Sequence, residues 1–213
     1  MTIMSTRQSS EITGVVLAGG MSRRLGRNKA LEQVAGRPLI ARVLDSLAEV
    51  ADQAVVVFGD TDRSDELGLP SWARGVVDVF PGKGALGGIY SGLNASQTDW
   101  CIVVACDMPF LNLRLLDLLL DHRDGYDAVV PYLDDRPEPT HAAYSRSCLP
   151  HIKNRLDLDQ LKIASFFGDV RVNRFPQSEI EAIDPNRLSF FNVNTQADLD
   201  RARSLAASER IVR

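Results

Sequence analysis

Residues 12–29 read ITGVVLAGGMSRRLGRNK, an apolar run followed by a segment too polar for a protein core. The run predicts a buried strand, and the glycines after it predict a tight turn. Glycine lets the backbone approach a ligand, so Gly19 and Gly20 can present bare N–H groups to phosphate oxygens. Four cationic side chains follow: Arg23, Arg24, Arg27 and Lys29. The segment therefore predicts a site for a nucleoside triphosphate.

A solvated basic turn is the alternative interpretation of this segment. Four cations in an empty loop would repel one another, which favours a bound anion. The segment is not a P-loop, because that motif needs Gly-Lys-Ser or Gly-Lys-Thr. Here Lys29 follows Asn28 and precedes Ala30.

The composition predicts one α/β domain. A chain of 213 residues, 45% apolar and 24% charged, can bury one substantial core. We expect a mobile tail at residues 1–10 and a single domain over residues 11–213. The net charge of -4 argues against sequence-independent binding of nucleic acid. The three cysteines form no CxxC pair, so we expect no zinc site or disulfide framework, and a cytoplasmic location. Neither export nor membrane insertion is expected.

Apolar runs bounded by turn residues recur along the chain: Ile12–Leu17, Ala54–Phe58, Gly75–Val79, Trp100–Ala105 and Ala128–Pro131. Most are continuous rather than alternating, which is typical of strands buried on both faces. Helical patterns lie between them, from Pro38 to Val50, around Leu113–Leu119, and in a short stretch toward Asn94. This alternation predicts a mainly parallel sheet flanked by helices, with ligands at the carboxyl ends of the strands.

The second half of the chain is less regular. We expect these features in chain order: a loop over Tyr132–Pro139, a short strand over His141–Tyr144, a helix capped by Ser147 with Pro150 in its first turn, a helix over Leu158–Phe167, a break at Asp184, an extended stretch over Phe190–Asn194, and a final helix opened by a capping box of Thr195 and Asp198.

Asp107 follows the run Trp100–Ala105 and is expected at the carboxyl edge of the sheet. A carboxylate there can hold Mg²⁺, which takes few protein ligands and completes its shell with water and substrate phosphates. The alternative is an aspartate that caps a turn or the next helix, and Pro109 favours a turn. The basic segment after the first apolar run favours the interpretation of Asp107 as a metal ligand.

A second glycine-rich segment spans Phe80–Gly88 and contains GxGxxG at Gly82, Gly84 and Gly87. Asp107 follows at about the twenty-residue spacing of a dinucleotide site. That fingerprint normally lies in the first strand-to-helix turn, whereas this one follows the third strand. Hydride chemistry is therefore disfavoured, and the same glycines can let the backbone approach a base or ribose.

Four further side chains are candidates. Asp78 can accept from the N1–H and exocyclic amine of guanine, although an aspartate that caps a turn is the alternative. Asn192 and Asn194 lie two apart in a stretch expected to be extended, and we expect only one of them to face the site unless the backbone kinks. His141 can donate to a phosphate, although a lone histidine near a strand start is more often structural.

With these residues in view, the chain resembles the molybdenum cofactor guanylyltransferases, the molybdopterin-guanine dinucleotide biosynthesis protein A family of the nucleotidyltransferase superfamily. Four ordered motifs carry the resemblance: Leu17-Ala18-Gly19-Gly20 with Ser22–Gly26 and Lys29, then Gly84–Ile89, then Cys106-Asp107-Met108-Pro109, then Phe191–Thr195 with Asp198-Leu199. The resemblance implies a three-layer Rossmann-like nucleotidyltransferase fold. It also implies GTP and Mg²⁺ as reactants, and molybdopterin guanine dinucleotide and pyrophosphate as products.

The resemblance implies roles for individual residues. These would bind the nucleotide: Leu17, Ala18, Gly19, Gly20, Arg24, Lys29, Asp78, Gly84, Gly87 and Asp107. Lys29, Arg23 and Asp107 would be catalytic, with Asp107 as the magnesium ligand. Asn192 and Asn194 would lie on the molybdopterin side.

The implied reaction is in-line attack by the terminal phosphate of molybdopterin on the α-phosphorus of GTP. That phosphate is already anionic, so no general base is needed. Lys29 with Arg23 or Arg24 would stabilise charge on the departing pyrophosphate. Nucleophilic catalysis by the protein is not supported, because no GxSxG elbow occurs and the cysteines lie in or beside apolar runs.

Two departures from the family pattern leave alternatives open. The family's Gly-Pro-Leu reads Gly84-Ala85-Leu86 here, and its methionine after the arginines is Leu25. Because the second glycine loop is linked to base choice, a related transferase that uses CTP or a sugar phosphate acceptor is one alternative. A binding protein without catalysis is the other, and the retention of Lys29 and Asp107 argues against it.

The expected partners are GTP and molybdopterin, together with proteins that insert or accept the molybdenum cofactor. No nucleic acid or membrane partner is expected. We expect the chain to act as a monomer or weak oligomer.

Overall fold

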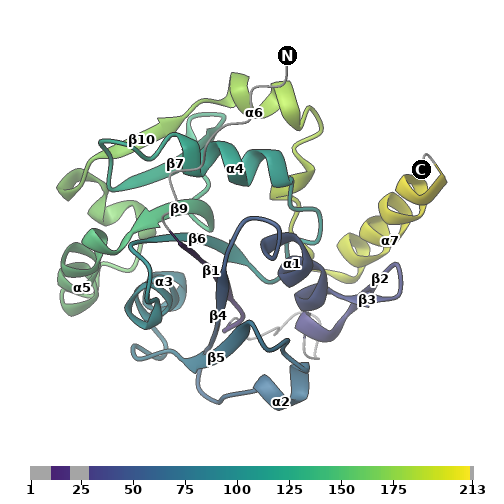
Figure 1. Ribbon diagram of the computed structural model, residues 1–213, viewed down its shortest axis with the longest axis horizontal. Coiled ribbons are helices and arrows are strands. Elements are labelled where there is room, and N and C mark those ends of the chain that lie inside the picture. Colours follow the sequence, from purple (N-terminus) through teal and green to yellow (C-terminus); the bar gives the residue numbers. More distant parts are fainter. Residues whose placement is uncertain (1–10, 20–28, 212–213) are drawn as a thin grey trace.

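A seven-strand path forms the centre of the molecule, with an eighth strand paired at one side. This computed structural model describes residues 11–19 and 29–211. Figure 1 shows the strands crossing the middle of the molecule with helices around them, in the order β10-β7-β9-β6-β1-β4-β5. The strands are β1 (Ile12–Leu17), β4 (Gln53–Phe58), β5 (Ala73–Val77), β6 (Trp100–Ala105), β7 (Ala128–Leu133), β8 (Arg136–Pro137), β9 (His141–Ser145) and β10 (Val172–Phe175).

The central sheet is mainly parallel, as the sequence predicts. Strands β5, β4, β1 and β6 pair in parallel. Strand β9 runs antiparallel between β6 and β7, β10 pairs in parallel with β7, and β8 forms a hairpin with β7. The carboxyl ends of β1, β4, β5, β6 and β7 therefore meet at one edge of the sheet.

Helices cover both faces of this sheet. They are α1 (Leu39–Leu47), α2 (Ser64–Leu67), α3 (Gly84–Ala95), α4 (Leu113–Asp121), α5 (Leu149–Asp157), α6 (Gln177–Ile183) and α7 (Gln196–Ile211), with 3-10 turns at Lys29–Leu31, Arg146–Cys148, Ile163–Asp169 and Leu188–Phe190. Buried side chains of α1 and α4 pack on one face of the sheet. Those of α3 and α5 pack on the other, so the expected three-layer fold is confirmed.

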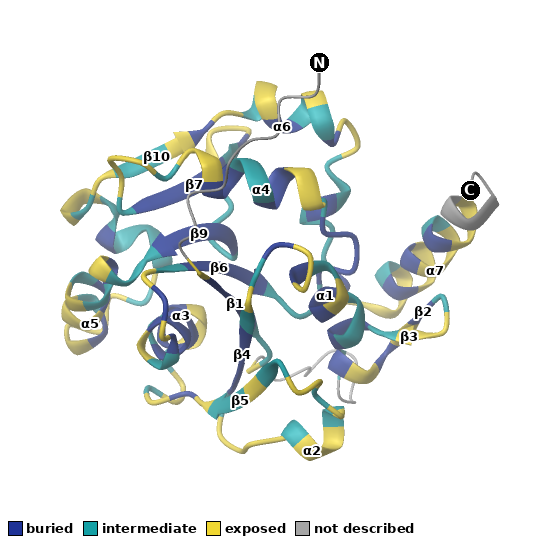
Figure 2. Ribbon diagram, viewed as in Figure 1, coloured by how far each residue is buried: buried dark blue, intermediate teal, exposed yellow. Residues whose placement is uncertain are grey.

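The apolar runs are continuous because both faces of the strands are covered. In β1, Val15 belongs to the core under α3, and the next residue, Val16, belongs to the core under α1. Both side chains are fully buried, and Figure 2 shows the strands of the sheet largely in the colour of buried residues. Burial on both faces thus favours a continuous apolar run, and the polar Thr13 is accommodated by hydrogen bonds to Ser96 and Thr98.

A third, smaller core joins the segment around Val34 to the C-terminal helix. Strands β2 (Gln33–Val34) and β3 (Arg37–Pro38) form a hairpin that the sequence analysis did not predict. Helix α7 lies beside this hairpin (Figure 1), with Val34 and Leu199 both fully buried in the shared core. Arg203 also donates to the Gln33 carbonyl at 3.0 Å. This packing holds the segment before α7 against the segment that carries Lys29.

The predicted end of the third strand is wrong. Strand β5 covers Ala73–Val77 rather than Gly75–Val79. The chain turns at Asp78, because its Oδ1 accepts from the Phe80 backbone N–H at 2.9 Å. Val79 then faces solvent, with 57% of its surface exposed.

The predicted helix over Leu158–Phe167 is also wrong. Helix α5 covers Leu149–Asp157, and a 3-10 turn begins only at Ile163. Between them Asp159 adopts a left-handed conformation with φ of 57°. The Gln160 N–H then bonds back to the Arg155 carbonyl at 2.9 Å, which terminates the helix.

Two smaller predictions in the second half also differ from the structure. Ser147 does not cap α5, because Ser145 Oγ accepts from the Ser147 N–H and opens the preceding 3-10 turn. Pro150 does lie in the first turn of α5, as expected. The region expected to be a loop over Tyr132–Pro139 holds the end of β7 and all of β8.

The final helix begins as the sequence predicts. Asp198 Oδ2 accepts from the Thr195 N–H at 2.8 Å, and the Asp198 N–H donates to Thr195 Oγ1 at 3.2 Å. These reciprocal bonds form a capping box. No described helix is long and apolar enough to cross a membrane.

Candidate functional site

The carboxyl ends of the central strands meet in a close backbone contact. The Ala18 N–H bonds to the Val57 carbonyl at 2.8 Å, so the chain after β1 continues alongside β4. A methyl group on Gly19 would lie 3.0 Å from the backbone nitrogen of Gly59, and one on Gly59 would lie 3.0 Å from the Gly19 oxygen. The edge of the sheet requires glycine at both positions for this approach.

A polar centre joins three segments that are far apart in sequence. Lys29 Nζ lies 2.6 Å from Asp107 Oδ2 and 2.8 Å from Asn194 Oδ1. Both charged side chains are largely enclosed, with 15% of each exposed. We name Lys29, Asp107 and Asn194 the strand-edge triad, after its place beyond β6.

Backbone contacts hold the triad in place. Asp107 lies in the turn after β6, in which the Met108 N–H bonds to the Ala105 carbonyl. The Val193 N–H donates to the Asp107 carbonyl oxygen at 2.9 Å, which fixes the segment before α7 against this turn. The Asn194 N–H donates to Asp198 Oδ2 at 3.0 Å. Asp198 is also part of the capping box of α7, so this box anchors the Asn194 backbone. Hydrogen bonds from Thr195 and from the backbone lower the pKa of Asp198.

The free oxygen of Asp107 fits a cation. Asp107 Oδ1 is buried and has no hydrogen-bond partner among the described residues. An unsatisfied carboxylate oxygen is costly unless an ion or water completes it. Over residues 11–19 and 29–211, no three His, Cys, Asp or Glu side chains gather as a metal cluster. A single carboxylate is the donor set expected for Mg²⁺ that takes its remaining ligands from water and phosphates.

The two predicted asparagines have different surroundings. Asn194 lies in the strand-edge triad, whereas the Asn192 side chain donates to the Phe190 carbonyl at 2.9 Å. Residues two apart in a regular strand share a face, so the different surroundings reflect an irregular stretch, which follows the 3-10 turn Leu188–Phe190 and contains no strand.

Asp78 closes the turn that leads into the second glycine segment. It is 8% exposed, and its Oδ1 accepts from Phe80 N–H and from Ser91 Oγ at 2.7 Å. This is the capping role that the sequence analysis held as the alternative. A base contact would have to use the second oxygen, Oδ2, which faces the first turn of α3 near Gly87.

The second glycine segment forms the start of α3. Gly82 and Gly84 have φ of 82° and 66°, in the region that favours glycine. Gly84 is the first residue of α3, and Gly87 lies in its first turn. Lys83 pairs with Asp159 at 2.7 Å, which ties this turn to the chain after α5.

Gly87→Ala is expected to destabilise the fold by about 1–3 kcal/mol, as overpacking does. The added methyl group would lie 3.0 Å from both Asp78 Oδ2 and the Phe80 carbonyl oxygen. The turn must shift to relieve this contact, so we also expect weaker GTP binding in a titration. Gly168→Ala is the matched control, since nothing lies within 4 Å of its added methyl group. Equal unfolding free energies for the two variants would contradict the prediction.

His141 is part of the core and makes no hydrogen bond to the strand-edge triad. It is the first residue of β9, pairs in register with Val104, and is fully buried. Its ring packs 4.7 Å from the Phe190 ring, and neither ring nitrogen has a partner in the described part of the chain. Burial lowers the pKa of His141 to about 3, so the imidazole is neutral at pH 7. The structural role is therefore the one observed.

Acidification is expected to destabilise the wild-type protein through His141. Between a folded pKa of about 3 and an unfolded value of 6.5, only the unfolded chain binds the proton. Stability therefore falls as pH drops below 6.5, by about 2 kcal/mol between about pH 7 and pH 5. Urea unfolding of His141→Leu should lack this part of the loss. His151→Leu, in α5, is the control and should retain it.

Several predicted site residues remain without a structural description. Gly20, Arg23 and Arg24 lie outside the described residues. Leu17 and Ala18 do lie at the strand edge, both half-buried. The sequence analysis missed the direct contact between Lys29 and Asn194, because nothing local links two residues 165 positions apart. Glu138, in the stretch expected to be a loop, was likewise not predicted as a site residue.

The chain matches known proteins over most of its length. The family described as "MobA-like NTP transferase domain" matches residues 14–171. A probable molybdenum cofactor guanylyltransferase from Pelotomaculum thermopropionicum is 38% identical over 200 residues, which cover 94% of this chain and 96% of the relative. A molybdenum cofactor guanylyltransferase from Desulfosudis oleivorans is 36% identical, covering 94% and 98%.

A solved structure agrees with these matches. Molybdopterin-guanine dinucleotide biosynthesis protein A from Archaeoglobus fulgidus has a TM-score of 0.80 and 30% identity, and the match covers 92% of this chain and 99% of that chain. The fold and the matched domain define the class of protein as a nucleotidyltransferase. Within that class the chain belongs to the MobA-like NTP transferase family. The family resemblance read from the four motifs is thereby confirmed.

Proposed function

We propose that this protein transfers GMP from GTP to the terminal phosphate of molybdopterin, giving molybdopterin guanine dinucleotide and pyrophosphate. The observation that carries the proposal is the strand-edge triad, in which Lys29 bridges Asp107 and Asn194. The names of the relatives supply the substrates, since the proteins from P. thermopropionicum and D. oleivorans are named as molybdenum cofactor guanylyltransferases.

In the proposed step a phosphate oxygen of molybdopterin attacks the α-phosphorus of GTP. The new P–O bond forms as the bond between the α-phosphorus and the α,β-bridging oxygen breaks, and pyrophosphate leaves with that electron pair. The nucleophile is already an anion, so the protein need not remove a proton. The work of the protein is to position two anions and to balance their charge.

Lys29 is suited to this work by its three N–H groups. Two of them reach Asp107 and Asn194, and the third, which has no partner in the described part of the chain, would bind a phosphate oxygen. The ammonium lies at the edge of the sheet, next to the segments that follow β1 and β6. It would stabilise the charge that develops on the pyrophosphate, together with Arg23 or Arg24 of the first glycine segment.

Asp107 would hold the magnesium ion through its free oxygen. When bound, Mg²⁺ neutralises phosphate charge and supports departure of the pyrophosphate. The Asp78 and Gly87 turn would provide the base-reading side of the nucleotide site, with Asp78 Oδ2 as the guanine acceptor. We propose a cytoplasmic location, and proteins that receive the molybdenum cofactor as further partners.

A CTP-dependent reaction or a sugar phosphate acceptor is the second candidate. It is favoured by Gly84-Ala85-Leu86 in place of the family's Gly-Pro-Leu. Release of pyrophosphate from GTP, CTP and other triphosphates, measured with and without molybdopterin, separates these functions. The proposal expects release from GTP that depends on molybdopterin. Equal release from CTP, or release that does not depend on molybdopterin, would overturn it.

A further inference from the structure

A pocket of about 320 Å³ opens beyond the carboxyl end of β7. Its walls come from the β7–β8 hairpin, from the segment before α7 and from α7 itself, including Glu138, Phe191 and Arg201. The volume lies at the lower end of the range for small-molecule sites. None of the roles proposed above uses this pocket.

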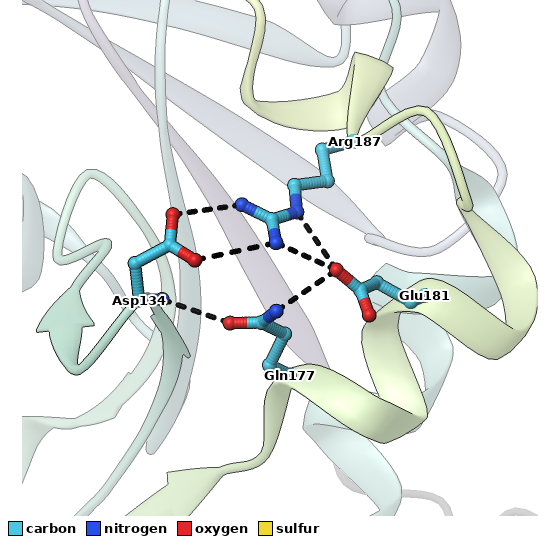
Figure 3. Close-up of polar contacts among 4 residues, drawn as sticks. All are labelled: Asp134, Gln177, Glu181 and Arg187. Atoms are coloured by element: carbon cyan, nitrogen blue, oxygen red, sulfur yellow. Dashed lines mark hydrogen bonds and ion pairs between the residues drawn. The ribbon is translucent and has the colours of Figure 1, made fainter.

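One wall of the pocket is fixed by a polar network. Figure 3 shows Arg187 between Asp134 of the hairpin turn and Glu181 of α6, at 2.9 Å and 2.6 Å. Gln177 completes the network, since its Oε1 accepts from the Asp134 N–H and its Nε2 donates to Glu181. Arg187 holds a left-handed backbone with φ of 52°. Arg187 is thus paired with two carboxylates, and it holds this wall of the pocket in position.

Three other charged side chains of the pocket lack such partners. Glu138 makes no side-chain hydrogen bond or ion pair to the described residues, although it is half-buried and burial raises its pKa. Arg136 and Arg201 likewise have no carboxylate partner in the described part of the chain, and the Arg201 guanidinium lies over the Phe191 ring. Arg136 and Arg201 are exposed, so water satisfies them, whereas the half-buried Glu138 carboxylate favours a ligand that donates hydrogen bonds to it.

Two hydrogen bonds hold the backbone at Glu138. The Glu138 N–H donates to the Pro131 carbonyl at 2.8 Å, and the Glu138 carbonyl accepts from the His141 N–H at 3.1 Å. Both bonds survive a change of the side chain. The backbone that carries Glu138 is therefore fixed, and Phe190 and Phe191 line the same pocket.

The pocket lies on the acceptor side of the strand-edge triad. Asp107 follows β6, and the nucleotide segments follow β1 and β5 on one side of it in the sheet order. The pocket follows β7, on the other side. Phe191 of the pocket and Asn194 of the triad are three residues apart, so at most about 10 Å of chain separates them.

We propose that this pocket binds the pterin head of the acceptor, with Glu138 accepting from the ring N–H and the exocyclic amine of its aminopyrimidinone edge. A carboxylate matches two parallel N–H donors with two short hydrogen bonds. Phe190 and Phe191 offer apolar surface to a flat ring. The inference rests on the proposed function, because it assumes that the acceptor carries a pterin.

Two fluorescent probes test this assignment. Pterin-6-carboxylate carries the exocyclic amine, whereas lumazine-6-carboxylate has a carbonyl oxygen at that position. We expect wild-type protein to bind the pterin at least about tenfold more tightly, because a carbonyl oxygen would face the Glu138 carboxylate. Glu138→Gln should lose this preference, since its amide donates to a carbonyl oxygen. Glu179→Gln, in α6 outside the pocket, should keep it.

The outcomes distinguish this inference from the proposed function. An unchanged preference in Glu138→Gln, or no saturable binding of the pterin probe to wild-type protein, overturns the inference even if GMP transfer occurs. A Glu138-dependent preference without GMP transfer to molybdopterin overturns the function and leaves the pterin site standing. When both hold, Glu138→Gln should raise the KM for molybdopterin at least about tenfold and leave the Kd for GTP unchanged.

Discussion

Asp107→Ala is expected to reduce magnesium-dependent turnover by at least about a thousandfold. The variant removes the buried Oδ1 that has no partner among the described residues, and with it the proposed support for the ion. A metal contributes several kcal/mol of charge stabilisation, and about 1.4 kcal/mol corresponds to a tenfold change in rate. Pyrophosphate release over a magnesium titration provides the measurement.

The fold should survive this change. The Asp107 carbonyl oxygen keeps its bond from Val193, and Lys29 keeps its bond to Asn194. Asp157→Ala is the matched control, because Asp157 pairs with Lys153 at 2.7 Å on the exposed face of α5. Near-normal turnover in Asp107→Ala at any magnesium concentration would refute the assignment.

Lys29→Ala is expected to weaken GTP binding and to lower turnover by about 10²–10³-fold, as loss of one charge-stabilising donor does. It should also destabilise the protein by about 1–3 kcal/mol, because both oxygens of the enclosed Asp107 then lack a donor among the described residues. Calorimetry with GTP and urea unfolding measure the two effects separately. An unchanged dissociation constant would count against the role of Lys29.

A double-mutant cycle sharpens this second prediction. The stability loss of Lys29→Ala should largely disappear in the Asp107→Ala background, where no carboxylate is left unpaired. The Lys153 and Asp157 pair provides the control cycle, with 51% and 53% of its side chains exposed. Exposed pairs at this helical spacing couple by about 0.3–0.5 kcal/mol. Equal coupling energies for the two pairs would contradict a special role for the enclosed pair.

The sequence predicted the strands that are buried on both faces better than those at the side of the sheet. Strands β1, β4 and β6 are continuous apolar runs, and their predicted ranges agree with the structure to within a residue. Strand β10 reads Val-Asn-Arg-Phe and was missed, because a strand at the end of the sheet needs fewer apolar residues. Strand β8 reads Arg-Pro and was missed, because a charged residue followed by proline is not typical of a strand.

Part of the candidate site could likewise be predicted from local sequence, and part depends on how the chain folds. Asp107 was predicted from a local rule, since it directly follows a buried strand. The contact of Lys29 with Asn194 depends on how α7 packs against the β2–β3 hairpin, which no local pattern reveals. Glu138 was not recognised, because what distinguishes it is a half-buried carboxylate without a charged partner among residues 11–19 and 29–211, which no local pattern reveals.

The position of β9 has a consequence for synthesis of the chain. Strands β1, β4, β5 and β6 all precede residue 106, whereas β9, which covers the open side of β6, ends at Ser145. Once β6 has left the ribosome and until β9 follows, we expect β6 to be an edge strand; its central residues, Cys101–Val104, are apolar and are buried in the complete fold. Such an edge is a template for pairing with another chain. The nascent protein is therefore most prone to aggregate during that interval, and β9 ends its exposure.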